Sequence, residues 1–309
     1  MNQELDFKYL YDNYISLFET RSYSKVVRLG NKKEKICRFC NKSFPEVNFK
    51  MKAHAIPELL GNRKIFTYYE CDECNEKFSR ILENHLGIYL KPYRAVMQMR
   101  GKKGFPTYKS DDSRICTDEE GKLLVITSID EPIGSLDEKN KKIIFKIKRE
   151  PYVPVAVFKT FVKMALSIIP EQELPELKWA IRWINETEHS KAPFNVNPLF
   201  IQFTPGPKPY EMMDVFLFKK KEDSMENIPE YLFAITFGNF LFQIFLCALN
   251  EKNDQKNRKF ILHYFPSKFG DDWAYGKTTR GNTDMSNNKF ENEAVDTIEM
   301  SYEKAYKEL

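Results

Sequence analysis

Two short cysteine motifs decide the fold of the first third of this chain: Cys37-Arg-Phe-Cys40 and Cys71-Asp-Glu-Cys74. Each places two thiols at the spacing with which a protein knuckle grips a metal ion, and 31 positions separate Cys40 from Cys71. Two such pairs complete a tetrahedral site for one Zn²⁺. A single C-x-x-C is also typical of redox pairs, but two suitably spaced pairs favour zinc. Because protein ligands then fill all four positions, we expect this zinc to fold the region and not to catalyse.

The rest of the composition is that of a globular protein. Hydrophobic residues make up 42% and aromatic residues 14% of the 309 residues, which excludes a disordered chain. No apolar run approaches the roughly 18–20 residues of a membrane span. The opening stretch MNQELDFKYLYDNY lacks the apolar segment of a secretory signal. We therefore predict a soluble, cytoplasmic protein whose cysteines are reduced.

The net charge of +4 is distributed unevenly along the chain. Residues 1–105 carry 20 Lys and Arg against 12 Asp and Glu, a net charge of +8, whereas residues 106–309 carry a net charge of −4. This separation indicates that the first part meets a polyanion such as DNA. The alternative is that the charge belongs to an ordinary solvated surface.

Between the two knuckles lies the stretch KAHAIPELLGN, residues 52–62, and Asn75 directly follows the last cysteine. The combined pattern, CxxC…H-x-I-P-x-x-L-G-N…CxxC-N, resembles the zinc-stapled HNH endonucleases of the ββα-metal type. The resemblance covers about residues 37–86. It implies a hairpin and a helix that grip one catalytic divalent cation, Mg²⁺ or Mn²⁺, in addition to the structural zinc. A single histidine is more often a surface or core residue, but this context favours catalysis.

The resemblance also implies individual roles. His54 matches the general base that activates water against the scissile phosphate, and imidazole suits that role because its ordinary pKa lies near neutral pH. Asn75 matches the last letter of the motif and would bind the catalytic cation through its amide oxygen. Asn62 is the nearest candidate for the middle letter, the residue that orients the histidine.

One position departs from the family pattern. Ala53 stands where many relatives carry an aspartate that binds the cation. Either Glu58 or Glu83 replaces that ligand, or the ion keeps more waters, or the site is weakened. Glu83 lies eight residues after Asn75, about 12 Å along a straight helix, so sharing one ion with Asn75 requires a bend.

Basic residues surround this region and predict contacts to DNA phosphates, which Lys and Arg bind without sequence preference. The candidates nearest the motif are Lys52, Arg63, Lys64, Lys77 and Arg80. Some of these side chains are expected to be solvated surface only.

The whole chain is predicted to be α+β, with an HNH domain in residues 1–105 and a C-terminal mixed domain in residues 106–309. Helices are expected at about 5–18, 154–169 and 176–185 and at the C-terminus, a linker at 100–113, and a loop at 267–292. Expected strands lie at 122–129, 142–148, 198–205, 214–221, 231–238, 239–249 and 259–266, several of them forming an antiparallel sheet.

The second half contains no catalytic motif. In residues 154–169 the apolar side chains fall on one face of a helix and Lys159, Lys163 and Ser167 on the other, which predicts a core helix with a polar side. An alternative is a ligand pocket lined by Tyr152, Lys159, Lys163, Trp179 and Trp183. By its resemblance, the chain is expected to act in anti-phage defence and to be regulated through this half by a nucleotide second messenger or an ATPase subunit, with homo-oligomerisation as a further possibility. The leading function is a DNA endonuclease; the alternative is a catalytically inactive zinc finger that binds nucleic acid or recruits a partner.

Overall fold

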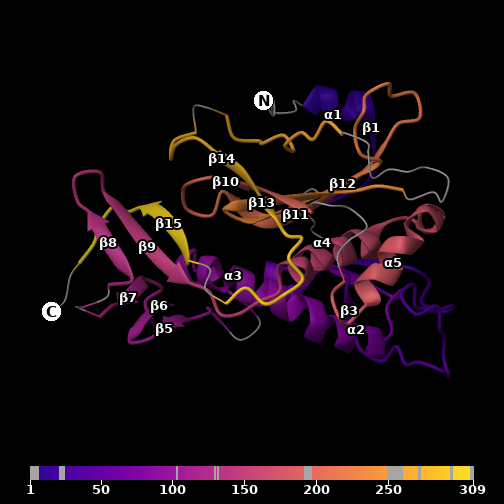
Figure 1. The fold of residues 1–309 in the computed structure, drawn as a ribbon, viewed down its shortest axis with the longest axis horizontal. Helices are drawn as coiled ribbons and strands as arrows, with labels where there is room; N and C mark the ends of the chain where they lie inside the picture. Colours follow the sequence, from indigo (N-terminus) through magenta and orange to yellow (C-terminus); the bar gives the residue numbers. More distant parts are fainter. Residues whose placement is uncertain are drawn as a thin grey trace.

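A six-stranded antiparallel sheet forms the centre of the molecule (Figure 1). The computed structural model describes residues 7–20, 25–101, 104–128, 130, 132–190, 197–248, 260–270, 273–292 and 295–306. The strands run in the order β1-β11-β12-β13-β10-β14. Their bounds are β1 Tyr14–Glu19, β10 Pro198–Phe203, β11 Tyr210–Lys220, β12 Tyr231–Gly238, β13 Phe240–Leu246 and β14 Thr279–Asp284. Every residue of β12 is buried because both faces of the sheet are covered.

Helix α4, Pro154–Ile168, lies against one face of this sheet (Figure 1). Proline at the first helical position suits a helix start, since its missing N–H has no partner there anyway. Beyond it come the 3₁₀ segment η3, Glu171–Leu177, and helix α5, Lys178–Asn185. The predicted helix at 154–169 is confirmed, but its polar side is buried as well as its apolar side. The reason is a third layer, which covers the side of α4 that faces away from the sheet.

That third layer is the cysteine-rich region. Strand β4, Ile65–Thr67, pairs in parallel with β2, Val27–Leu29, and antiparallel with β3, Ala53–His54. The 3₁₀ turn η1, Glu58–Leu60, lies in the connection between β3 and β4. After the second cysteine pair the chain forms α2, Asp72–Phe78, a π-helical turn η2, Ser79–Glu83, and α3, Asn84–Val96. The π turn and α3 both contact α4.

Two small sheets stand at one end of the molecule (Figure 1). One contains β5 Tyr108–Ser110, β6 Ser113–Thr117 and β7 Leu123–Ile126, and the other contains β8 Gly134–Asp137, β9 Lys142–Lys148 and β15 Val295–Ser301. The predicted α+β class, with a zinc-type N-terminal region and an antiparallel sheet, is confirmed. The domain boundary at residue 105 stays a prediction, and β1 from the first segment pairs with β11 from the second.

Several predicted elements differ in the structure. The expected N-terminal helix is short: α1 spans Phe7–Asn13 and then gives way to β1, while residues 1–6 lie outside the described part. The predicted linker contains β5, and its residues 102–103 are also outside the described part. The polar stretch between the strands at 122–129 and 142–148 holds β8, which pairs with β9.

The C-terminal segments show why backbone pairing escaped prediction. Residues 260–266 form no extended strand; instead Gln243 of β13 bonds to the backbone of His263 and Phe265, so this segment covers the sheet through side-chain contacts. The expected loop at 267–292 contains β14, whose residues are all exposed and pair with β10 in an antiparallel register. The expected C-terminal helix is wrong, because β15 pairs with β9. Within the described residues, no helix is long and apolar enough to cross a membrane.

Candidate functional site

The four cysteine sulfurs converge on one point. Cys37, Cys40, Cys71 and Cys74 form the one group of three or more Cys, His, Asp or Glu among the described residues whose ligand atoms lie together, all within 4.8 Å of one another. Four sulfurs bound about 2.3 Å from a tetrahedral ion lie about 3.8 Å apart. The Cys40 and Cys71 sulfurs are 3.8 Å apart. The thiol set therefore fits a structural zinc ion, as the spacing predicts.

The local backbone explains this convergence. In the first knuckle the Cys37 N–H donates to the Lys42 carbonyl and the Asn41 N–H to the Cys37 carbonyl, which folds the loop back on itself. In the second, Cys71 is the N-cap of α2 and its sulfur accepts the Cys74 N–H. Crowding lets the Cys74 thiol donate to Cys37, which lowers the pKa of Cys37 to about 5. The pKa of Cys71 is raised by burial and that of Cys74 by its hydrogen bond to Cys37, so the charge of a bound cation would be needed to deprotonate these two thiols.

His54 lies at the end of β3, directly opposite Phe66 of β4. Its imidazole is half-buried, and its ring centre lies 4.8 Å from that of Phe66. The short hairpin therefore holds the imidazole against an aromatic wall while leaving part of it accessible to solvent. This is a suitable environment for a general base that must meet a water molecule.

Asn62 is buried and acts on the backbone around His54. Its amide nitrogen donates to the carbonyls of Ile56, at 2.6 Å, and Ile65, at 2.9 Å. Its amide oxygen accepts the N–H groups of Lys64 and Ile65. The Ile65 carbonyl also accepts the Ala55 N–H, so Asn62 fixes the connection that leads out of β3. A role of Asn62 in orienting His54 stays a prediction. Asn62 would act on His54 indirectly, by fixing the backbone of this connection.

Asn75 lies in the second turn of α2, immediately beyond the zinc cysteines, and is half-buried. Ala53 precedes His54 and is 3% exposed, so the strand offers a methyl group where an acidic ligand is common. Among the described residues, no group of three or more acidic or imidazole side chains assembles near His54. The amide of Asn75 fits a hard cation that keeps most of its waters, because Mg²⁺ dehydrates reluctantly and takes few protein ligands.

The two acidic candidates have different surroundings. Glu83 ends the π turn, and the chain stays helical from Asn75 to Glu83 as it passes from α2 into that turn. Its carboxylate lies 3.6 Å from the Lys163 amine. Glu58 is half-buried in η1 and forms no ion pair with any residue that the structure describes.

Lys163 of α4 reaches across to this region. Its amine lies 2.9 Å from Glu70 and 3.5 Å from the carbonyl oxygen of His54, to which it donates. Burial raises the pKa of Glu70 to about 7, against the opposing effect of the lysine. Burial also disfavours the charged lysine, but Glu70 and Glu83 outweigh it and raise the pKa of Lys163. Glu70 directly precedes Cys71, so one amine connects the zinc motif, the histidine strand and α4.

Two further contacts join the zinc region to the second half. The buried Arg38 guanidinium, within the first knuckle, donates to the carbonyls of Leu166 and Ile169 at the end of α4. Such carbonyls lack helical partners, and a cation is favourable beside them. Asn185, the last residue of α5, donates to the Phe39 carbonyl at 3.0 Å and accepts from Lys77 of α2. The second half thus contacts both the first knuckle and the helix that carries Asn75.

The predicted DNA-binding residues fall into two groups. Lys52, Arg63 and Arg80 are exposed. Lys64 and Lys77 are half-buried, and Lys77 is engaged by Asn185. The alternative pocket in the second half is not supported at its lysines, because Lys159 and Lys163 are buried and make contacts within the fold.

Sequence reasoning missed the contribution of Lys163, Arg38 and Asn185. A lysine in an otherwise apolar helix was the available signal, because buried lysines need a partner of opposite charge. The identity of that partner was not readable, since Glu70 and Lys163 are distant in sequence.

Comparison with known proteins agrees with the motif. Residues 37–90 match the family model of the HNH endonucleases. No curated protein and no solved structure gives a significant match to the chain.

Proposed function

We propose that this protein is a metal-dependent DNA endonuclease whose centre comprises His54 and Asn75. The match of residues 37–90 to HNH endonucleases supports a nuclease-type function. The observation that carries the proposal is that His54 lies on a hairpin strand and Asn75 on the helix that follows the hairpin. That helix carries two of the four clustered cysteines, and β3 pairs with β4, the strand that leads into it. DNA is the expected substrate of such a domain.

In the proposed reaction His54 takes a proton from a water molecule. The water oxygen bonds to phosphorus as the bond from phosphorus to the 3′ oxygen breaks, and the leaving oxygen then gains a proton from solvent. Asn75 would hold a divalent cation, which when bound polarises the phosphate and stabilises charge on the leaving oxygen. Asn62 keeps the hairpin connection in place, so that His54 meets the water at a fixed position.

Glu58 is the acidic side chain that we assign to the neighbourhood of the cation. Its carboxylate has no ion-pair partner within the described residues, whereas Glu83 is paired with Lys163. Glu83 would instead help to fix the position of the histidine strand through that lysine.

Regulation through the second half is a further part of the proposal. Lys163, Arg38 and Asn185 connect the two halves. Movement of α4 or α5 would therefore displace the histidine strand and α2. A nucleotide second messenger or an ATPase subunit would act through these helices. The role in anti-phage defence rests on the sequence resemblance alone.

The alternative is a catalytically inactive zinc finger that binds nucleic acid. The buried Ala53 in place of an acidic ligand is the observation that favours it.

A comparison of metal dependence separates the two. Asn75→Ala should lower nicking of supercoiled plasmid at low Mn²⁺, and raised Mn²⁺ should restore part of the rate, because the lost group is a metal ligand. Lys109→Ala, in β5 outside the HNH match, is the control and should leave the metal dependence unchanged. Absence of nicking by the unmodified protein at every concentration of Mg²⁺ and Mn²⁺, with retained DNA binding, would favour the inactive alternative.

A further inference from the structure

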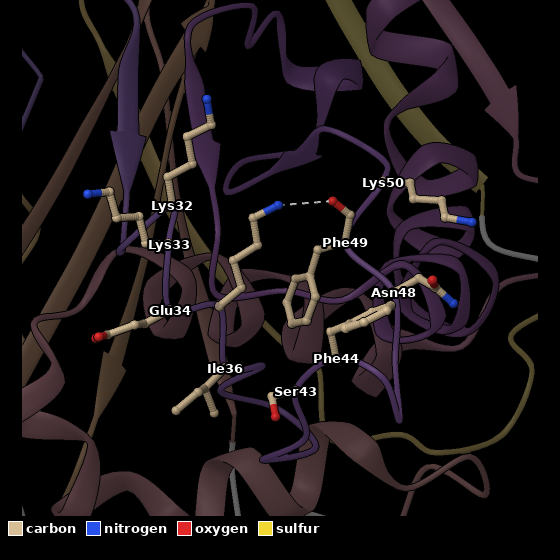
Figure 2. A pocket seen from close by; sticks show the side chains of 10 residues that line it. Lys32, Lys33, Glu34, Ile36, Ser43, Phe44, Asn48, Phe49 and Lys50 are labelled. Carbon is tan, nitrogen blue, oxygen red and sulfur yellow. Dashed lines mark hydrogen bonds between the residues drawn. The ribbon is translucent and has the colours of Figure 1, made fainter.

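A groove beside the first zinc knuckle combines lysines with an uncovered aromatic ring (Figure 2). It lies between the loop that follows β2, residues 32–36, and the two short stretches 43–44 and 48–50. We call it the knuckle groove. Its volume of about 600 Å³ lies within the range of about 300–1,000 Å³ that is typical of ligand sites.

The lysines of the knuckle groove are not neutralised by the protein. Lys32, Lys33 and Lys50 are exposed and form no ion pair with any residue that the structure describes. The one carboxylate in the lining, that of Glu34, accepts a hydrogen bond from Asn31. Lys35 is a fourth lysine of the lining, so the four lysines and the one carboxylate together carry a net charge of +3, which attracts a polyanion.

The floor of the groove is aromatic. Lys35 donates to the Phe49 carbonyl at 3.2 Å, a bond that joins two of the segments lining the groove. Phe44 lines the same groove as Phe49 and is 75% exposed, an unusual position for a phenylalanine (Figure 2). An aromatic face among lysines is suited to stacking with a nucleic-acid base. In a duplex the base faces are covered by their neighbours, so such a ring favours an unpaired base.

The rim of the groove is fixed to the proposed catalytic helix. The N–H groups of Lys50 and Met51 each donate at 2.9 Å to the carboxylate of Asp72, the first residue of α2. The same segment continues directly into the strand that ends at His54. A nucleic-acid strand held in the groove would therefore have a defined position relative to His54 and Asn75.

We propose that the knuckle groove binds single-stranded DNA, with phosphates on Lys32, Lys33 and Lys50 and an unpaired base stacked on Phe44. The substrate of the nuclease would then contain an unpaired segment, as at a flap, a bubble or a strand end. This inference rests on the proposed function for its meaning, but the binding it describes can be measured without cleavage.

The test is fluorescence anisotropy of the full chain with a labelled 20-nucleotide oligothymidylate and with a labelled 20-base-pair duplex, without added Mg²⁺ or Mn²⁺. Base–aromatic stacking is worth about 1–3 kcal/mol per base, so Phe44→Ala should weaken single-strand binding about tenfold and leave duplex binding within about twofold. Phe44→Trp should retain single-strand binding. Phe290→Ala removes another exposed phenylalanine, 60% exposed, as the matched control and should change neither affinity.

Lys32→Gln combined with Lys33→Gln should flatten the dependence of single-strand affinity on salt. The slope of log K against log salt should fall in magnitude by about 0.7 for each single-strand phosphate that a lysine no longer neutralises. Competition by polyglutamate as effective as that by oligothymidylate would assign the groove to an acidic protein and overturn the proposal. Equal weakening of single-strand and duplex binding in Phe44→Ala, or no weakening of either, would also overturn it. If the unmodified protein nicks DNA but Phe44→Ala leaves single-strand affinity unchanged, the groove proposal alone is refuted. If single-strand binding depends on Phe44 but the protein cleaves no DNA, the nuclease proposal alone is refuted.

Discussion

Lys159 and Lys163 stand one turn apart on α4, and both are essentially inaccessible to solvent, yet their surroundings differ. Lys163 has Glu70 at 2.9 Å and Glu83 at 3.6 Å, and its pKa is raised. The carboxylate nearest to Lys159, that of Glu186, is 3.9 Å away, and burial lowers the pKa of Lys159 to about 8. The Lys163 amine connects the two halves of the molecule. The Lys159 amine is buried, and its positive charge is only weakly compensated by a carboxylate.

The difference indicates where α4 contributes to the proposed site. The Lys163 region faces the histidine strand and the zinc motif. The Lys159 region faces Trp183, with the amine 5.1 Å from the ring centre, and lies near His189, whose Nδ1 has no hydrogen-bond partner within the described residues. Burial and the neighbouring Lys159 charge lower the pKa of His189 to about 4. His189 is therefore neutral near pH 7, and Lys159 is the cation of this second region, with only Glu186 and the Trp183 ring to offset the cost of its burial.

Among the changes considered, removal of zinc should have the largest effect on folding, and it should unfold the cysteine-rich region only. Structural zinc supplies the folding free energy of small domains, so Cys71→Ser should abolish zinc binding and unfold residues from about 37 to 86. Hydrogen exchange should then show loss of protection in α2, with protection kept in β12 and β13. Equal loss in both regions would show that the sheet depends on the zinc motif, and an unchanged α2 would contradict the structural role of zinc.

Lys163→Met should have the next largest effect, a loss of unfolding free energy. Breaking a buried ion pair by removal of one partner costs about 3–5 kcal/mol of unfolding free energy, because the remaining charge is left uncompensated. Denaturant unfolding at pH 8 measures this loss, and Lys163→Arg, which keeps the positive charge, should lose less. A Lys163→Met protein as stable as the unmodified chain would show that the contacts to Glu70 and Glu83 contribute nothing.

Lys159→Met should raise the free energy of unfolding, whereas Lys163→Met should lower it. The lowered pKa of Lys159 means that its contribution to stability is present above about pH 10.5, the ordinary lysine value, and is lost as the pH falls through about 8. At pH 7 the buried charge is a cost, so the apolar variant should be more stable by about 3 kcal/mol. The difference between the two proteins should shrink between pH 8 and pH 10, as followed by denaturant unfolding. Destabilisation by Lys159→Met at pH 7 would mean that Trp183 and Glu186 compensate the charge fully.

The predictable parts of this molecule were those with local patterns. The two C-x-x-C pairs specified the zinc cluster because four ligands at fixed spacing leave few alternatives, and Pro154 together with an apolar run specified α4. Residues 279–284 carry no apolar pattern, so the pairing of β14 depends on the exposed edge of β10 and could not be read locally. The C-terminal strand β15 likewise requires β9, which is distant in sequence.

The candidate site divides in the same way. His54 and Asn75 came from a motif, and Asn62 came with them, although its hydrogen bonds go to the backbone of Ile56 and Ile65 and not to a motif side chain. The lysine that meets the His54 carbonyl comes from 109 positions away. Contacts of that kind depend on how α4 packs between the sheet and the zinc region, which no short pattern encodes.

Nicking of supercoiled plasmid by the unmodified protein and by His54→Ala tests the central claim most directly. Both proteins should bind DNA and zinc equally, because the imidazole is not a ligand of the cysteine cluster. Loss of a general base typically costs 10²–10⁴-fold in the chemical step, so His54→Ala should nick more slowly by about that factor in Mg²⁺ or Mn²⁺. Nicking by His54→Ala at the rate of the unmodified protein would contradict the assignment of this chain as a His54-dependent nuclease.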